Sequence, residues 1–343
     1  MPLKVAPLAA EHLEAVAVMV AERYRAARAE ISFLPAAYLD PKAIAPRLKT
    51  HIGRVPGVVA LEDDLPAGFV LSLLVSNRGE RMAYVPDFAH GAEIGREYEL
   101  YRRMYAEIAD DWLASGCFVH GITLYPNNQA ATAAWFSLGF GLVVMDALRV
   151  VNTAEMEEYP SLPTGVDIRR ASPDEVNLIA PLELALNRHL AASPAFLPLI
   201  VDGGRSALAD WLEDPSHALW IAFSNGEAAA YLRFEPSESL VLPTSAETTV
   251  SITGAYTRED LRGRGIGAAL LRAGLQWAGS TGYARCSVDF ESANLPGSAF
   301  WLRQFEPVTH SLIRRVDPRL AWANARRDAN DVWHAYEGDT WIG

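Results

Sequence analysis

Three closely spaced glycines stand where an expected β-strand gives way to an expected helix. Residues 248–256 alternate hydroxyl-bearing and apolar side chains, as β-strands do, and residues 268–277 are rich in Ala and Leu, as helices are. Between them the chain reads Arg262-Gly263-Arg264-Gly265-Ile266-Gly267. Because glycine has no Cβ, such a loop can curl and turn its N–H groups toward an anion at the positive end of the helix. The stretch therefore predicts a strand, a phosphate-binding loop and a helix.

The glycines can be compared with two common nucleotide-binding loops. A P-loop is excluded, because it needs Gly-Lys-Ser/Thr at the start of the helix, and this chain has Gly267-Ala268 there. A dinucleotide-binding Rossmann loop remains an alternative, with Ala268 as the third small residue and Asp289 as the acid after the next expected strand. However, that loop opens its domain, whereas residues 166–247 precede this one in its half of the chain.

The sequence reads as two halves that repeat the same order of elements. Residues 3–7 and residues 166–170 each form an expected strand before a helix that starts with acidic residues, at an offset of 166 − 3 = 163 positions. Asn128 and Asn294 also correspond, at an offset of 294 − 128 = 166. Residues 153–165 contain prolines and polar residues, which is typical of a linker. We therefore expect one domain at 1–152, a linker at 153–165 and a second domain at 166–343 that includes a C-terminal tail.

The pattern Arg262-x-x-Gly265-x-Gly267 after a strand resembles the acetyl-CoA loop of the GNAT superfamily of acyl-CoA N-acyltransferases. That family continues with a strand, an Asn and a helix that ends in aromatic residues, and residues 285–290, Asn294 and residues 300–305 follow this order. Gln304 departs from the pattern, since the family has Gly there. The resemblance implies an α/β fold with a mixed sheet, built as two tandem GNAT-like domains in a layout similar to that of mycothiol synthase.

The N-terminal half resembles the same family only in part. Residues 128–140 match its second motif closely, but at the expected phosphate position the half has Glu93, Ile94 and Gly95. A glutamate at that position would repel a pyrophosphate. We therefore expect the N-terminal domain to be degenerate in its cofactor loop and to support an active C-terminal domain.

The resemblance implies that acetyl-CoA is the co-substrate, and it assigns residues to it. Backbone amides at the end of the central strand would polarise the thioester carbonyl, the glycine loop would hold the pyrophosphate, and the Asn before the next helix would contact the pantetheine arm. The positions concerned are Ala255, Tyr256, Thr257, Arg262, Gly263, Arg264, Gly265, Ile266, Gly267 and Asn294.

The implied reaction is direct attack of a primary amine of a small molecule on the thioester, an EC 2.3.1-type acyl transfer. The amine must lose a proton, and the candidates for the base are Glu247 at the start of the central strand and Asp289 and Glu291 at the end of the next. The family's usual tyrosine acid is absent, because Phe300 and Trp301 occupy that helix, so Tyr256 is the candidate that could protonate the leaving thiolate. Solvated carboxylates at strand ends and a tyrosine in the core explain the same residues equally well, and these assignments stay open.

The composition of the chain limits the kinds of molecule that we expect it to bind. A net charge of −12 over 343 residues argues against binding to nucleic acid or to anionic membranes, and it mildly favours a cationic substrate. No apolar run approaches the roughly 20 residues of a membrane span, and residues 1–4 open no signal-peptide pattern. The histidines and the two cysteines, Cys117 and Cys286, have no zinc-ligand spacing, so we expect no metal and two buried thiols. We expect a cytoplasmic enzyme, monomeric or homodimeric; the alternative is an acyl-CoA-binding pseudoenzyme or a partner-binding module without turnover.

Overall fold

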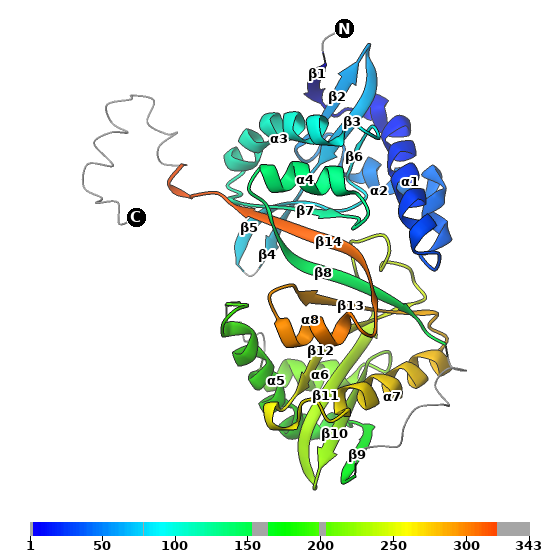
Figure 1. Ribbon diagram of the computed structural model, residues 1–343, viewed down its shortest axis with the longest axis vertical. Helices are drawn as coiled ribbons and strands as arrows, with labels where there is room; N and C mark the ends of the chain where they lie inside the picture. Colours follow the sequence, from blue (N-terminus) through cyan, green and yellow to red (C-terminus); the bar gives the residue numbers. More distant parts are fainter. Residues whose placement is uncertain (1–2, 78, 153–163, 199–203, 321–343) are drawn as a thin grey trace, which may run out of the picture. The chain divides into compact units, whose positions relative to one another are not determined.

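The computed structural model describes residues 3–77, 79–152, 164–198 and 204–320 (Figure 1). These residues form a mixed α/β structure, as the sequence predicts. Most of the expected linker, residues 153–163, and residues 321–343 of the expected tail lie outside the described part of the chain.

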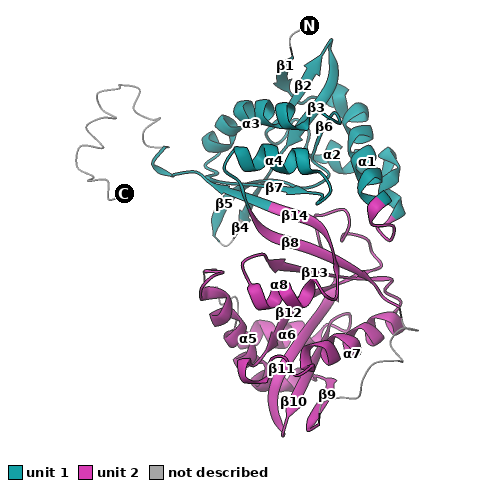
Figure 2. Cartoon of the chain, viewed as in Figure 1, with its two compact units in different colours: residues 1–29, 36–141, 312–343 teal, residues 30–35, 142–311 magenta. Residues whose placement is uncertain are grey.

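The chain divides into two compact units (Figure 2). The N-terminal unit comprises residues 1–29, 36–141 and 312–343, and the C-terminal unit comprises residues 30–35 and 142–311. This division differs from the expected border between 152 and 166, because it follows strand pairing and not chain order. The strand Gly141–Val150 closes the first half of the sequence, yet it pairs antiparallel with Arg285–Glu291 of the C-terminal unit.

In its described residues before β8 (Gly141–Val150), the N-terminal unit has eleven helices and strands and two short 3₁₀ turns. In chain order they are β1 (Lys4–Pro7), η1 (Ala10–His12), α1 (Leu13–Glu30), η2 (Ala36–Leu39), α2 (Pro41–His51), β2 (Gly57–Glu62), β3 (Leu65–Leu71), β4 (Leu73–Asn77), β5 (Glu80–Val85), β6 (His90–Ala92), α3 (Glu97–Ala114), β7 (Val119–Leu124) and α4 (Gln129–Ser137).

The strands of the N-terminal unit follow the orders β1-β2-β3-β6 and β4-β5-β7. Residues 86–89 separate β5 from β6, and the two strands have different partners. Strand β5 pairs parallel with β7, whereas β6 pairs antiparallel with β3. The long helix α3 is held by an apolar stripe, because its residues at helical spacing, among them Leu100, Met104 and Ile108, are fully buried. This unit therefore has its own core.

The C-terminal unit begins at the strand that closes the first half of the sequence. Its elements are β8 (Gly141–Val150), β9 (Val166–Arg170), η4 (Pro173–Glu175), α5 (Val176–Ala191), α6 (Gly204–Glu213), β10 (Ala218–Ser224), β11 (Glu227–Pro236), β12 (Thr249–Thr257), η5 (Glu259–Leu261), α7 (Ile266–Thr281), β13 (Arg285–Glu291), α8 (Leu295–Trp301) and β14 (Glu306–Arg315), of which the last four residues belong to the N-terminal unit.

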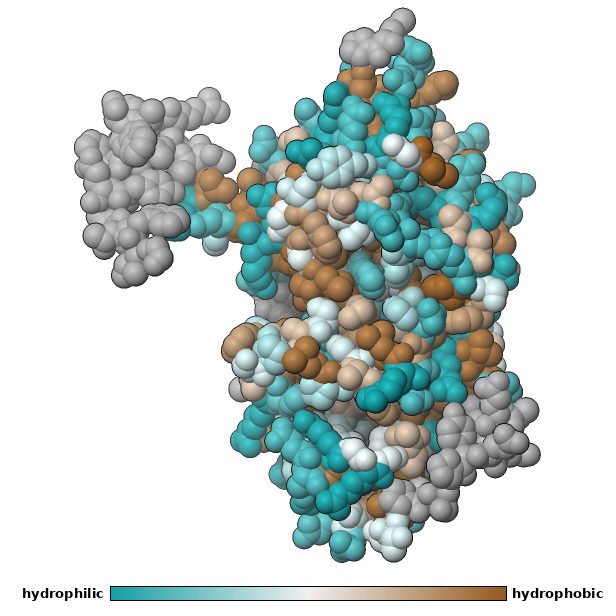
Figure 3. All heavy atoms as spheres, in the orientation of Figure 1, coloured by the Kyte–Doolittle hydropathy of each residue, from teal (hydrophilic) through white to brown (hydrophobic). Residues whose placement is uncertain are grey.

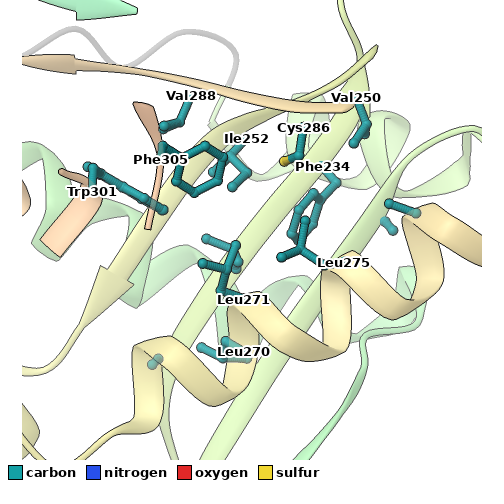
Figure 4. Packing of buried hydrophobic residues seen from close by; sticks show 14 of the residues in the cluster. Phe234, Val250, Ile252, Leu270, Leu271, Leu275, Cys286, Val288, Trp301 and Phe305 are labelled. Carbon is teal, nitrogen blue, oxygen red and sulfur yellow. The ribbon is translucent and has the colours of Figure 1, made fainter. Parts of the chain in front are cut away.

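The strands of the C-terminal unit lie in the order β8-β13-β12-β11-β10-β9, and β12 and β13 are the parallel pair. Helix α7 covers one face, where Leu271 and Leu275 pack with Phe234 and the buried thiol of Cys286 (Figure 4). Helices α5 and α6 supply residues to a second cluster, which includes Tyr231 of β11. Successive residues of a strand point to opposite faces, which explains why neighbouring positions of β11 enter different clusters.

Strand β12 has two neighbouring strands for only part of its length. It pairs with β11 from Val250 to Thr257, whereas its pairing with β13 covers only Thr249 to Ile252. The register with β11 shifts between Arg233 and Phe234, which marks a β-bulge at this point. The bulge thus lies beside Gly254, and β12 and β13 part beyond Ile252.

The two cysteines and the length of the apolar helices can also be compared with the expectations from the sequence. Cys117 and Cys286 are free, buried thiols, as predicted. No helix in the described ranges is long and apolar enough to cross a membrane. On the face shown in Figure 3, hydrophilic and hydrophobic side chains are intermixed on both units.

Candidate functional site

The turn between β12 and α7 has the backbone that the glycine pattern predicts. Gly263 and Gly265 have φ values of 75° and 83°, in the left-handed region that side chains other than glycine rarely adopt. Gly265 is the N-cap of α7 and provides no side-chain cap. The N–H groups of the first helical turn have no acceptor within the helix, and the helix dipole makes this end positive. The turn is therefore ready to receive an anion.

A cavity of about 620 Å³ lies beside this turn in the C-terminal unit. Residues of α5, β11, β12, α7 and α8 line it, so it adjoins the part of β12 that has parted from β13. All predicted cofactor residues except Arg264 line this cavity: Ala255, Tyr256, Thr257, Arg262, Gly263, Gly265, Ile266, Gly267 and Asn294. The exposed Arg264 lies in the same turn.

None of the three candidates for the base lines the cavity. Glu247 is exposed in the turn before β12, and Asp289 is exposed on β13, where it pairs in register with Asp146 of β8. Tyr256 does line it, and the Arg262 guanidinium carbon lies 5.5 Å from the centre of the Tyr256 ring. The end of β12 that faces the cavity carries neither side chain, and the assignment of a base to Glu247 or Asp289 stays a prediction.

The cavity contains a histidine that the sequence did not single out. His189, near the end of α5, places Nε2 3.1 Å from Oδ1 of Asn294 and Nδ1 3.9 Å from a carboxylate oxygen of Glu259. A single His on a helix has no spacing signal. Only the tertiary structure brings the end of α5 to the N-cap of α8.

The cavity also contains a tyrosine that the sequence did not single out. Tyr231 of β11 is only 2% exposed, and burial raises the pKa of its hydroxyl far above the ordinary value. Its hydroxyl oxygen lies 3.3 Å from the position that a Cβ would take at Gly254. The protonated Tyr231 hydroxyl therefore lies close to Gly254 of β12. The backbone amides of the next residues, 255–257, are those predicted to hold the thioester carbonyl.

The charge of the cavity differs from the charge of the whole chain. Among the described residues that line it, none is Asp or Glu, whereas Arg262 and Arg303 are present. The excess of acidic residues that suggested a cationic substrate lies elsewhere. The two guanidinium groups suit an anion. Within the described ranges no cluster of three His, Cys, Asp or Glu could hold a metal ion.

The corresponding turn of the N-terminal unit is occupied by the chain itself. The backbone N–H of Gly95 donates to Oε2 of Glu97 at 2.6 Å. Arg96 pairs with Glu62 and Glu93 at 2.7 and 3.0 Å. A carboxylate therefore already binds at the start of α3, which agrees with the degenerate loop expected from the sequence.

Strands β6 and β7 of the N-terminal unit are bridged by a buried histidine. His90 is fully buried, with Nε2 2.9 Å from the Thr123 carbonyl oxygen and Nδ1 2.8 Å from the Tyr101 hydroxyl. Burial and the nearby Arg23 guanidinium hold the pKa of His90 well below its ordinary value. The neutral ring therefore donates to the carbonyl and accepts from the phenol. In the C-terminal unit the corresponding position, where β12 is no longer paired with β13, adjoins the cavity.

Residues 189–306 match the model of the acetyltransferase (GNAT) family, and no curated protein matches the sequence. The fold is similar to that of a GCN5-related N-acetyltransferase from Sphaerobacter thermophilus, with a TM-score of 0.57 and 12% identity over 91% of this chain and 95% of that chain. A GCN5-related glucosamine N-acetyltransferase region in a fungal multi-domain GH3 β-N-acetylglucosaminidase has a TM-score of 0.50 and 15% identity over 91% of this chain and 38% of that one. A tandem GNAT protein from the clavulanic acid biosynthesis pathway, solved without AcCoA, is 15% identical over 92% of this chain and 98% of that chain, with a TM-score of 0.49.

These similarities coincide with the site. The matched range contains the glycine turn, the parted β12 and most of the residues that line the cavity. Residues 189–306 therefore match the GNAT acetyltransferase family, and the chain has the fold of a GCN5-related N-acetyltransferase over 91% of its length.

Proposed function

We propose that the protein is an N-acetyltransferase that transfers the acetyl group of acetyl-CoA to a primary amine of a small molecule by direct attack, in its C-terminal unit. One observation carries this proposal. A single cavity joins the glycine turn before α7 to the edge of β12 that has parted from β13. One end of the cavity suits a pyrophosphate, and the other offers backbone amides beside a space for a second reactant.

The donors present fit acetyl-CoA as a co-substrate. The N–H groups from Gly263 to Gly267 and the guanidinium groups of Arg262 and Arg303 are the anion-binding groups of the cavity. The amides of residues 255–257 are the donors for the carbonyl oxygen, which gains negative charge during attack. When bound, acetyl-CoA supplies a thioester whose thiolate leaves readily, and the chain's own groups orient it and move protons.

The proposal places one acetyl-CoA on each chain. In the N-terminal unit the Glu97 carboxylate already accepts the Gly95 N–H at the start of α3. A pyrophosphate would have to displace this carboxylate and would meet Glu93 nearby. The N-terminal unit would accordingly support the fold without binding the co-substrate.

Calorimetric titration with acetyl-CoA tests the proposal, and Gly265→Glu is the informative variant. We expect one-site binding by the wild type and none by the variant. Gly95→Glu is a matched control, because Gly95 has a φ of 85° and also precedes a helix, in the other unit. It should bind acetyl-CoA as the wild type does. Absence of binding by the wild type, or wild-type affinity in Gly265→Glu, would refute the proposed site.

A second candidate function is acyl-CoA binding without turnover, and Phe300 favours it. The Phe300 ring lines the cavity and lies 3.5 Å from the position of a Cβ at Gly267, in the helix where the resembled family has its tyrosine acid. A thiol-release assay with a panel of primary amines separates the two functions. Release above the no-amine rate supports the transferase, and tight binding without release supports the pseudoenzyme.

A further inference from the structure

The Asn294 side chain has one orientation determined by the helix that it caps. Its Oδ1 accepts the backbone N–H of Gly297 at 3.3 Å, as the N-cap of α8. A backbone N–H can only donate, so the capping atom must be the oxygen. The same oxygen lies 3.1 Å from Nε2 of His189. Nε2 must therefore carry the hydrogen, which leaves the lone pair of the neutral ring on Nδ1.

His189 is distinct among the titratable groups that line the cavity. The other titratable groups among the described lining residues are Tyr231, Tyr256, Arg262 and Arg303, whose ordinary pKa values lie at about 10 or above. An imidazole is the side chain whose ordinary pKa lies near neutrality, so it can both take and release a proton there. No carboxylate lines the described cavity and could compete for this role.

We propose that His189 is the base that takes the proton from the acceptor amine, and that Asn294 is the positioning residue that keeps Nδ1 free to do so. The inference rests on the proposed acetyl transfer and names the group that the sequence left unidentified. The His189 side chain is 22% exposed, so a reactant in the cavity can reach it. Asn294 acts through the ring, by accepting its Nε2–H.

Charged side chains of several elements lie around His189. Glu259 of η5 lies 3.9 Å from Nδ1, is 71% exposed and also lies 3.5 Å from the Arg262 guanidinium. Arg188 precedes His189 on α5 and is exposed. One and a half turns earlier on α5, Glu183 is paired with Arg233 at 2.8 Å. The exposed Glu259 carboxylate offers a protonated ring a path by which a proton can pass to water.

The reaction balances in atoms and protons with the amine, the thioester and water as the only reactants. The amine nitrogen forms a bond to the carbonyl carbon, the C–S bond breaks, and the sulfur leaves with the electron pair of that bond. The N–H proton moves to Nδ1 of His189 and then to water, the sulfur takes the proton of the Tyr231 hydroxyl, and that hydroxyl regains a proton from water, so that an amide and a thiol result. If the amine arrives as an ammonium ion, its extra proton leaves first, through His189 to water.

Nitrogen NMR of the histidine side chains tests the positioning step in the whole protein with acetyl-CoA present. The His189 signal is assigned as the one missing from His189→Gln. We expect hydrogen on Nε2 and a lone pair on Nδ1 in the wild type, and a mixture of both tautomers in Asn294→Ala. A wild-type ring with its hydrogen on Nδ1 would overturn the proposal.

Rates of thiol release against pH test the base, with benzylamine first in a panel of primary amines. We expect His189→Gln to lose about 10²-fold or more in kcat, as for loss of a general base, while its affinity for acetyl-CoA stays within about twofold. Asn294→Asp keeps an acceptor at the cap and adds a negative charge beside Nε2–H. It should therefore move the acidic limb of the rate profile to higher pH.

The matched control is Asn128→Ala. Asn128 caps α4 of the N-terminal unit in the same way, with Oδ1 accepting the Ala131 N–H at 2.9 Å. Its loss costs a helix cap but should leave the rate profile unchanged. A His189→Gln rate equal to the wild-type rate, or no thiol release with any amine from a protein that binds acetyl-CoA, would overturn the base. Failure to bind acetyl-CoA would instead overturn the proposed function.

Discussion

The Gly95 N–H and the Glu97 carboxylate, 2.6 Å apart, close the anion site of the N-terminal unit from within. Gly265 occupies the corresponding place before α7, and its helix has no side-chain cap. The two units therefore differ at the start of two corresponding helices, α3 and α7. One satisfies its N–H groups with its own carboxylate, and the other leaves them for a ligand.

The first prediction concerns this internal anion. Glu97→Ala should lower the free energy of unfolding by about 1–3 kcal/mol, because a largely buried, charge-assisted hydrogen bond is lost. Urea denaturation measures the change. The exposed Glu107 of the same helix is the control, and Glu107→Ala should change stability by less than about 0.5 kcal/mol. Equal effects of the two substitutions would mean that the Glu97 contact does not stabilise α3.

The second prediction compares two glycines of helix α7. A Cβ at Gly274 would lie 2.1 Å from two atoms of the buried Phe234 ring (Figure 4 shows Phe234 against this helix). Gly274→Ala should therefore destabilise the protein by about 1–3 kcal/mol through overpacking, although Ala favours helices by about 1 kcal/mol.

Gly267 provides the matched comparison within α7. A Cβ there would meet Phe300 and Thr257 at 3.5–3.7 Å, which is ordinary contact. Gly267→Ala should therefore cause no loss of stability without ligand. Thermal unfolding of both variants measures the difference, and a Gly274→Ala protein as stable as the wild type would show that the Phe234 ring can move aside.

The third prediction is a loss of stability in mild acid that depends on His120. This side chain is 1% exposed and bonded to the Tyr105 hydroxyl at 2.8 Å, and burial lowers the pKa of His120 to about 4. The unfolded chain takes up this proton below about pH 6.5. Between about pH 6.5 and 4 the unfolded state therefore binds more protons, and each unit of falling pH costs the folded state about 1.4 kcal/mol from this residue.

Urea midpoints at several pH values between 7.5 and 4.5 measure this dependence. His120→Gln should be less stable than the wild type near neutrality, because it loses hydrogen bonds, but its stability should fall less steeply with acid. His90, whose pKa burial also holds well below its ordinary value, should keep part of the slope in the variant. An unchanged slope would mean that His120 is protonated in the folded protein.

The fourth prediction assigns the acid that protonates the leaving thiolate in the proposed reaction. Burial raises the pKa of the Tyr231 hydroxyl, so it keeps its proton at neutral pH. Tyr231→Phe should lower kcat by about 10²-fold, the lower end for a general acid, because a thiolate leaves readily. Tyr256→Phe keeps the ring beneath Arg262 and should be close to the wild type. The opposite order in the thiol-release assay would assign the acid to Tyr256.

The sequence alone determined the local structure at the centre of the site. Left-handed backbone at Gly263 and Gly265 follows from residues next to one another in the chain, and so does the strand-to-helix change around them. The internal repeat predicted two related units, and Glu93 to Gly95 predicted that the first would lack an anion loop. Such inferences succeed because backbone preferences and helix starts depend on near neighbours.

Only the tertiary structure decided which side chains meet in the cavity. His189 and Tyr231 reach it from α5 and β11, far from the glycine turn in sequence, whereas Glu247 and Asp289 flank the central strands in sequence but do not line the cavity. The exchange of β8 into the C-terminal unit was likewise invisible in chain order. The physical reason is that convergence of distant residues is determined by strand pairing and by the burial of apolar faces, which act between elements and leave no pattern at fixed spacing.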